Sequence, residues 1–250
     1  MKPVVVDSWT HLRRLTPARI ALGRAGPGVP TQEVLAFGLA HARARDAVHQ
    51  ALDVESLKAD LKAIGFDAAV VASAAPDRAT YLRRPDLGRR LREGTPLGGK
   101  AEIMVALEDG LSAVAVQRHG AALLRALCSL NPTLWKTASI VIALQGRVAL
   151  GDEIGERLGA KLAIVLIGER PGLSSPDSLG AYLTSQPKVG RSDAERNCVS
   201  NIRPEGLGYA EAARTIDWLA AAALARGITG VALKDESAKK GSEQISDNSR

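Results

Sequence analysis

Short apolar runs alternate with helical segments through the second half of the chain, and this alternation restricts the fold more than any other feature. The runs cover residues 102–107, 139–144 and 162–167 and are rich in Val, Ile, Leu and Ala. Strands covered on both faces need continuous apolar runs, and parallel strands need helical crossovers between them. Because such crossovers are almost always right-handed, we predict an α/β domain with a Rossmann-like, mostly parallel sheet over residues 101–237.

Helices are expected between and after these runs. One opens at Ser112, which can cap it, a short one lies near residues 152–158, and a long one covers residues 209–226. The run at 230–233 is expected to add a last strand. The tail at 238–250 is polar and is predicted to be disordered.

Residues 1–100 have a different pattern and are predicted to form an N-terminal arm and a mainly helical subdomain. The arm is rich in Pro and Gly, with a short helix expected near Pro17. Thr31 is expected to cap a helix over residues 32–52, and Asp53 to cap the next helix.

Gly65 ends that second helix, because glycine readily adopts the left-handed conformation found after helix ends. A β-type run at 68–72 and a loop-rich stretch follow it. We place the domain boundary near residue 100, where the strand–helix alternation begins.

Composition restricts the class of protein. Aromatic residues make up only 3% of the chain, so its core must be mainly aliphatic. No apolar run approaches the ~20 residues that span a bilayer, and Asp7 interrupts the first one, which argues against a signal peptide. Cys128 and Cys198 belong to no Cys-x-x-Cys or Cys/His cluster, which argues against structural zinc. We expect a cytoplasmic protein without disulfides.

The net charge of +6 raises the question of nucleic-acid binding. The densest basic group, at residues 83–92, contains no aromatic side chain on which bases could stack. A solvated or subunit-contacting loop explains this segment better, and a partner with acidic patches or phosphates accounts for the charge equally well.

Three segments follow predicted strands or their loops, where open α/β sheets bind ligands. Asp109-Gly-Leu-Ser112 is a strand-to-helix turn whose amides could face a ligand, although a plain capped turn explains it better. Gly168-Glu-Arg-Pro-Gly-Leu173 offers a carboxylate that accepts hydrogen bonds from a ligand or forms a salt bridge with the neighbouring arginine. Asn197-Cys-Val-Ser-Asn-Ile-Arg203 offers a compact, soft side chain. No histidine lies near it in sequence, so a Cys/His nucleophile has no local support.

Two familiar nucleotide-binding motifs are missing. No Gly-x-Gly-x-x-Gly follows a strand, which argues against the usual dinucleotide fingerprint. No Gly-x-x-x-x-Gly-Lys-Ser/Thr is present, which excludes a P-loop.

An ordered set of blocks runs along most of the chain. In the first part these are Thr16-Pro-Ala-Arg-Ile-Ala-Leu-Gly-Arg-Ala-Gly26, His41-Ala-Arg-Ala-Arg-Asp-Ala-Val48 and Tyr81-Leu-Arg-Arg-Pro-Asp-Leu-Gly-Arg-Arg90. In the second part they are Asp109-Gly-Leu-Ser112, Gly146-Arg-Val-Ala-Leu-Gly-Asp-Glu-Ile-Gly155, Gly168-Glu-Arg-Pro-Gly-Leu-Ser-Ser-Pro-Asp-Ser-Leu179 and Asp193-Ala-Glu-Arg-Asn-Cys-Val-Ser-Asn-Ile-Arg-Pro-Glu-Gly206. Together, in this order, they resemble the small subunit of ethanolamine ammonia-lyase.

The resemblance implies a two-subunit enzyme that holds adenosylcobalamin between a large TIM-barrel subunit and this small subunit. The family's cofactor contacts fall on Val148 in Gly-Arg-Val, Glu169 in Gly-Glu-Arg-Pro-Gly and Cys198 in Asn-Cys-Val-Ser-Asn. The cofactor's radical chemistry converts ethanolamine to acetaldehyde and ammonia, with substrate contacts expected on the large subunit. We therefore assign no catalytic residue and no metal ligand to this chain.

The motif Asp-x-His-x-x-Gly is absent from the sequence, and its absence bears on the lower ligand of cobalt. One class of cobalamin proteins uses it to supply a histidine to cobalt, so here the cofactor's own dimethylbenzimidazole should stay as the lower ligand. The resemblance also makes a bacterial microcompartment an alternative location to the open cytoplasm. A stand-alone Rossmann-like nucleotide-binding enzyme is the alternative function, and a basic nucleic-acid-binding module ranks below it.

Overall fold

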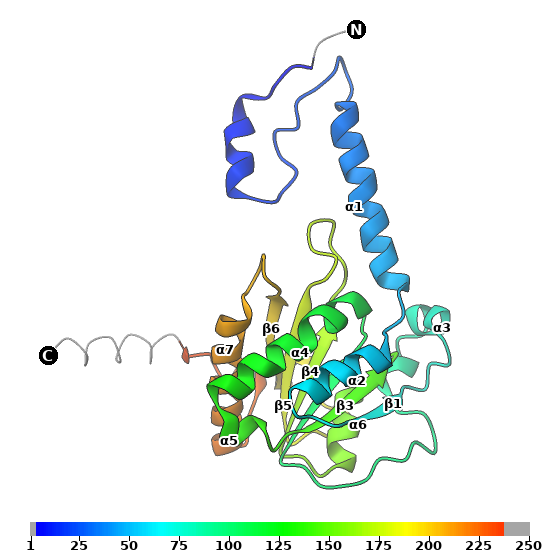
Figure 1. Cartoon of the computed structure of the whole chain (residues 1–250), viewed down its shortest axis with the longest axis vertical. Coiled ribbons are helices and arrows are strands. Elements are labelled where there is room, and N and C mark those ends of the chain that lie inside the picture. The colour runs from blue at the N-terminus through cyan, green and yellow to red at the C-terminus, as the bar shows by residue number, and fades with distance from the viewer. Residues whose placement is uncertain (1–3, 238–250) are drawn as a thin grey trace, which may run out of the picture.

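A computed structural model describes residues 4–237 (Figure 1). A six-stranded sheet lies at its centre, with the strand order β1-β3-β2-β4-β5-β6. The pairings among β1, β3, β2 and β4 are parallel, whereas β5 pairs antiparallel with both β4 and β6. The predicted α/β class with a mostly parallel sheet is confirmed.

The described part of the chain contains the following elements. The strands are β1 (Ala68–Ala72), β2 (Ile103–Glu108), β3 (Ser139–Leu144), β4 (Leu162–Gly168), β5 (Leu179–Ser185) and β6 (Arg196–Ile202). The α-helices are α1 (Thr31–His49), α2 (Val54–Ala63), α3 (Arg78–Arg83), α4 (Ala113–Leu130), α5 (Pro132–Trp135), α6 (Leu150–Arg157) and α7 (Tyr209–Arg226). The 3₁₀ helices are η1 (Ser8–Leu15), η2 (Leu87–Arg89), η3 (Asp193–Glu195) and η4 (Gly230–Ala232).

The central strand β2 contributes side chains to two hydrophobic cores, one on each face of the sheet. Ile103, Val105 and Leu107 belong to a cluster with residues of α2, α4, α5 and α7. Met104 and Ala106 belong to a second cluster with residues of α6. Because successive side chains of a strand point to opposite faces, a strand covered on both sides needs the continuous apolar run seen in the sequence.

Two predicted helices are confirmed together with their ends. Asp53 caps α2, its carboxylate accepting a hydrogen bond from Ser56 N at 3.0 Å, and Gly65 follows the helix with φ +91°. Tyr209–Arg226 forms α7 as predicted, and Gly227 ends it in the left-handed conformation with φ +67°. These ends follow from local chemistry, since a carboxylate satisfies a free helix N–H and glycine tolerates positive φ.

Two details predicted for the N-terminal part are wrong. The short helix expected near Pro17 lies earlier, at η1, where Asp7 accepts a hydrogen bond from Trp9 N at 2.8 Å. Thr31 is the first residue of α1 rather than its cap, because Pro30 occupies the cap position without a side-chain hydrogen bond.

The strand predicted at 230–233 is also wrong, because this segment forms η4. The Asn197 side chain accepts a hydrogen bond from Gly230 N at 2.9 Å and donates one to Leu233 O at 2.8 Å. These bonds satisfy backbone groups that a strand would pair with a neighbour. The strands that complete the sheet are instead β5 and β6, which the sequence analysis did not predict.

The N-terminal arm, residues 4–49, stands away from the sheet (Figure 1). Within α1 only Ala47 is buried. Ten of the fifteen exposed large hydrophobic side chains in the described residues lie in this arm, among them Leu35, Phe37 and Leu39. Exposed apolar side chains gathered in one segment are typical of a surface that binds another protein.

β1 belongs to the same sheet as β2, although it precedes residue 100, where we expected the domain boundary. The tail at 238–250, which was predicted to be disordered, lies outside the described residues. Across residues 4–237, none of the helices combines the length and the hydropathy needed to cross a membrane.

Candidate functional site

The loops that follow β2, β3 and β4 meet at one edge of the sheet and line a pocket of about 440 Å³. The lining residues are Tyr81, Gly110, Leu111, Arg147, Val148, Ile167, Gly168, Glu169, Arg170 and Tyr182. The three strands are parallel neighbours, so their carboxyl ends lie together. The pocket therefore forms at the edge where open α/β sheets bind ligands.

Val148 and Glu169, two of the three predicted cofactor contacts, both line this pocket. Val148 lies just before α6 and packs against the hydrophobic cluster on that face of the sheet. Glu169 directly follows β4, and its backbone N–H donates to Ser178 O at 2.9 Å. Val148 and Glu169 thus share one cavity because they follow β3 and β4, the two strands that flank β2.

One oxygen of the Glu169 carboxylate is held in place, and the other is free. Oε2 accepts hydrogen bonds from the Ser178 hydroxyl and from Asn201 N, the latter at 3.3 Å. Oε1 accepts no hydrogen bond from the described residues, and no ion pair joins Glu169 to Arg170. A tethered, half-buried carboxylate with a free oxygen is suited to accept an N–H from a ligand.

Cys198, the third predicted contact, is exposed on β6 and lies outside the pocket lining. It stands opposite Tyr182 in the register of β5 and β6, and Tyr182 does line the pocket. Burial raises the pKa of Tyr182, and the neighbouring Cys198 and Glu169 raise it further. Tyr182 thus lies next to both predicted contacts and connects Cys198 to the pocket.

Asp109 joins the loop after β2 to the loop after β3. Its carboxylate accepts hydrogen bonds from Gln145 N at 2.9 Å and from Gly146 N at 3.1 Å. Burial raises the pKa of Asp109. The carboxylate therefore has a structural role in the loop that carries Val148.

The rest of the turn after Asp109 is tightly packed. Gly110 has φ +55°, and a Cβ there would lie 2.3 Å from Gly168 O. Ser112 precedes α4 as predicted, but its hydroxyl donates to Pro176 O at 2.8 Å instead of capping the helix. Of this segment only Gly110 and Leu111 line the pocket, so the plain-turn interpretation holds for Ser112.

The ethanolamine ammonia-lyase light-chain family matches residues 6–234 of the chain. The small subunit of this enzyme from Azotobacter vinelandii is 54% identical over 244 residues, which covers 94% of this chain and 90% of the relative. The chain belongs to the ethanolamine ammonia-lyase small-subunit family. The small subunit from Xanthomonas campestris pv. campestris is 55% identical over 240 residues, 92% of this chain and 88% of the relative. The small subunit from Ralstonia nicotianae is 52% identical over 242 residues, which covers 93% of this chain and 90% of the relative.

Membership of the ethanolamine ammonia-lyase small-subunit family confirms the predicted resemblance. The family belongs to a carbon–nitrogen lyase, and a small subunit implies a large partner subunit. The matched range includes the N-terminal arm as well as the sheet. Within residues 4–237, no group of three or more His, Cys, Asp or Glu side chains is arranged to hold a metal ion.

Sequence reasoning missed three polar residues that line the pocket of this family member: Tyr81, Arg147 and Tyr182. Tyr81 is fully buried, and its hydroxyl donates to Gly146 O at 2.8 Å. The chain has only three tyrosines, and two of them line this pocket. The small number of tyrosines could have pointed to these two residues. A buried tyrosine needs a hydrogen-bond partner for its hydroxyl, so a tyrosine in an aliphatic core marks a polar site.

Glu108, the last residue of β2, lies buried beneath the loop that carries Val148. Neither carboxylate oxygen has a hydrogen-bond partner in the described residues. A Cβ on Gly146 would lie 2.5 Å from Glu108 Oε2, so this glycine lets the loop close over the carboxyl group. Burial raises the pKa of Glu108 well above its ordinary value of 4.5.

Glu108→Gln is expected to remove a pH dependence of stability. Above pH 4.5 the unfolded chain releases the Glu108 proton while the folded chain keeps it, so native stability falls as pH rises. The slope reaches up to about 1.4 kcal/mol per pH unit. Urea unfolding between pH 5 and 8 should show the variant gaining stability relative to the native chain. Glu102→Gln, an exposed glutamate before the same strand, is the control, and equal pH profiles for Glu108→Gln and the native chain would contradict the assignment.

Proposed function

We propose that this chain is the small subunit of an adenosylcobalamin-dependent ethanolamine ammonia-lyase, which converts ethanolamine to acetaldehyde and ammonia. In this proposal it holds one side of the cofactor against a large TIM-barrel subunit. The observation that carries the proposal is the pocket at the carboxyl edge of the sheet. It brings Val148 and Glu169 together and lies next to Cys198 through Tyr182.

The pocket fits part of such a cofactor. A corrin with its nucleotide loop and adenosyl group is much larger than a cavity of about 440 Å³, so a second protein surface must cover the rest. The lining mixes apolar Leu111, Val148 and Ile167 with the free oxygen of Glu169. The Arg147 Nε atom is buried without an acceptor, which leaves a donor for a ligand. A few placed polar groups in an apolar lining are typical of cofactor sites.

The side chains here bind and orient rather than react. Glu169 accepts N–H bonds from the amide groups on the cofactor's rim, and its tether to Ser178 fixes the direction from which it does so. Val148 packs against apolar parts of the cofactor, and Cys198 offers a compact contact beside Tyr182. When bound, the cofactor supplies the radical that abstracts hydrogen from substrate, and the protein supplies placement.

We infer that the two parts of the chain have different binding partners, the cofactor and the large subunit. Parallel strands with helices on both faces support a Rossmann-like assignment for the sheet domain, 101–237, which contacts the cofactor. Residues 1–100, apart from β1, which pairs within the sheet, form the arm and helical subdomain that contact the large subunit. The exposed apolar side chains of the arm support this role. The cytoplasm, or a bacterial microcompartment inside it, stays the predicted location.

Glu169→Ala is expected to weaken cobalamin binding by the two-subunit complex by roughly 10- to 100-fold, because a charged hydrogen-bond acceptor is lost. The variant should still fold, since Glu169 lies at the pocket rather than in the core. Spectroscopic titration of the reconstituted complex gives the dissociation constant, and acetaldehyde formation reports activity.

Glu102→Ala is the matched control, because this exposed glutamate lies just before β2, at the sheet edge opposite the one where Glu169 follows β4. It should leave cofactor affinity unchanged. If Glu169→Ala bound cobalamin as tightly as the control, Glu169 would not be a contact. Binding of NAD(P) or ATP by the chain alone, with no cobalamin binding by the complex, would favour the nucleotide-binding alternative.

A further inference from the structure

A second pocket, of about 430 Å³, adjoins the first and is rich in arginine. Arg89, Arg147, Arg191 and Arg196 are four of its lining residues. Arg147 and Val148 line both pockets, so the two cavities meet at the loop between β3 and α6. The two cavities therefore lie on either side of the same two residues.

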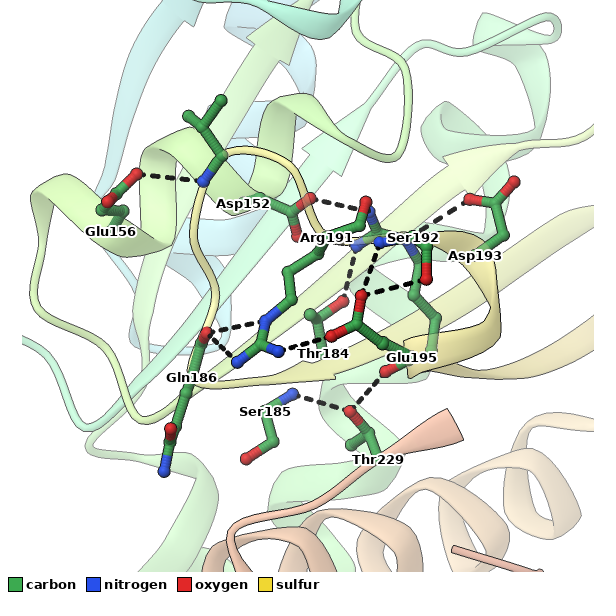
Figure 2. A network of polar contacts seen from close by, with 12 residues as sticks. Asp152, Glu156, Thr184, Ser185, Gln186, Arg191, Ser192, Asp193, Glu195 and Thr229 are labelled. Carbon is green, nitrogen blue, oxygen red and sulfur yellow. Dashed lines mark hydrogen bonds and ion pairs between the residues drawn. The ribbon is translucent and has the colours of Figure 1, made fainter. Parts of the chain in front are cut away.

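Two of these arginines are neutralised by carboxylates. Arg196 donates to both Asp152 oxygens, at 2.6 and 2.7 Å, and Arg191 donates to Glu195. Figure 2 shows Arg191, Glu195 and Asp152 within one network beside Asp193. These contacts hold Arg191 and Arg196 in place where they line the pocket.

The other two arginines lack such partners. Within residues 4–237, neither Arg147 nor Arg89 forms an ion pair. Arg89 is exposed and its side chain makes no hydrogen bond to the described residues. Two guanidinium groups therefore remain available for an anion at the junction of the pockets.

Arg147 is held in one orientation although it lacks an anionic partner. Its guanidinium carbon lies 4.3 Å from the centre of the Tyr81 ring, and Nη2 donates to Tyr81 O at 3.4 Å. Its backbone N–H donates to Gly88 O at 2.9 Å. A Cβ on Gly88 would lie 2.9 Å from Arg147 Cγ, so glycine is needed for this packing. An arginine fixed in this way has little conformational entropy left to lose when it binds a ligand.

We propose that this second pocket binds a phosphate anion through Arg147 and Arg89, and that the anion is the phosphodiester of cobalamin's nucleotide loop. This proposal rests on the proposed function. The planar fork of arginine matches phosphate oxygens. The four arginines and the carboxylates of Asp152, Asp193 and Glu195 leave one net positive charge, which matches the single charge of a phosphodiester.

Arg147→Met tests the proposal in the complex with the large subunit. Methionine keeps an unbranched apolar side chain over Tyr81 but removes the donors. We expect cobalamin to bind roughly 10- to 100-fold more weakly to the variant. Cobinamide, a corrinoid without the phosphate and nucleotide loop, should bind equally well to the variant and to the native complex. Titration of each corrinoid by its absorption spectrum measures both dissociation constants.

Three further variants sharpen the result. Arg147→Lys keeps the charge but loses the fork, so its loss of cobalamin affinity should be intermediate. Arg89→Met alters an exposed side chain that folding does not need, and should weaken cobalamin alone. Arg226→Met, at the exposed end of α7, should change neither affinity.

Other outcomes separate this proposal from the proposed function. An equal loss of cobalamin and cobinamide affinity in Arg147→Met and Arg89→Met would overturn the phosphate assignment and leave the cofactor site intact. Binding of inorganic phosphate that depends on Arg147, with cobalamin affinity unchanged in the variant, would assign the pocket to a free anion and overturn the nucleotide-loop assignment. A native complex that binds neither corrinoid would overturn the proposed function as well.

Discussion

Asp152→Ala is expected to lower the free energy of unfolding by about 3–5 kcal/mol. The Asp152 and Arg196 side chains are each only 2% exposed, and two short hydrogen bonds join them. Alanine would leave the buried guanidinium with two uncharged acceptors, Thr184 Oγ1 and Arg191 O. Its one remaining carboxylate, that of Asp193, is 97% exposed and lies 3.5 Å from Nε. Urea unfolding followed by circular dichroism measures the difference.

Two controls separate loss of the pair from loss of packing. Asp152→Leu combined with Arg196→Met removes both charges and should recover much of the lost stability, because a buried ion pair can be replaced by apolar side chains. Asp86→Ala breaks an exposed pair, with Arg84, and should leave stability nearly unchanged. If Asp152→Ala and Asp86→Ala proved equally stable, the buried pair would not be a stabilising contact.

Loss of assembly is the second large effect expected, from substitutions in the N-terminal arm. Changing Leu35, Phe37 and Leu39 together to serine should weaken association with the large subunit by at least about 30-fold, the effect of a single strong apolar anchor. All three side chains are exposed in the isolated chain, so the fold itself should be preserved. Sedimentation of mixed subunits measures association, and circular dichroism checks the fold.

Val231→Ser provides the matched control for the arm. Val231 is 83% exposed but lies on η4, outside the arm. The Val231→Ser variant should therefore bind the large subunit as the native chain does. Normal association by the triple variant would show that the arm is not the contact surface.

The parts of the fold that sequence reasoning predicted are those that local chemistry determines. β3 and β4 are continuous apolar runs because helices cover both faces of the sheet. α2 begins after Asp53 and ends before Gly65 because a carboxylate caps a helix start and glycine tolerates the left-handed conformation. Residues close together in sequence determine whether a strand is buried on both faces and where a helix ends. A single sequence is therefore enough to predict both.

The parts that were missed depend on tertiary contacts. β6 has the sequence Arg196-Asn-Cys-Val-Ser-Asn-Ile202, in which few residues are apolar, and its pairing with β5 rather than its composition makes it a strand. The same pairing places Cys198 opposite Tyr182, which no spacing in the sequence indicates. Arg147 is a candidate anion-binding residue because its guanidinium lies over the Tyr81 ring without an anionic partner, and only the structure shows this arrangement.

The strand order also has a consequence for how the chain acquires its structure during synthesis. The order of the strands in the sheet differs from their order in the chain. β1 can pair only after β3 has been synthesised, and β2 has both of its neighbours only after β3 and β4 have been synthesised. Pairings between segments so far apart are slow to form, since loop closure costs entropy before any contact compensates. Until α7, which ends at residue 226, emerges from the ribosome, the apolar faces of β2 and β4 lack their full cover. Such nascent chains are prone to aggregation, which makes them natural clients of chaperones.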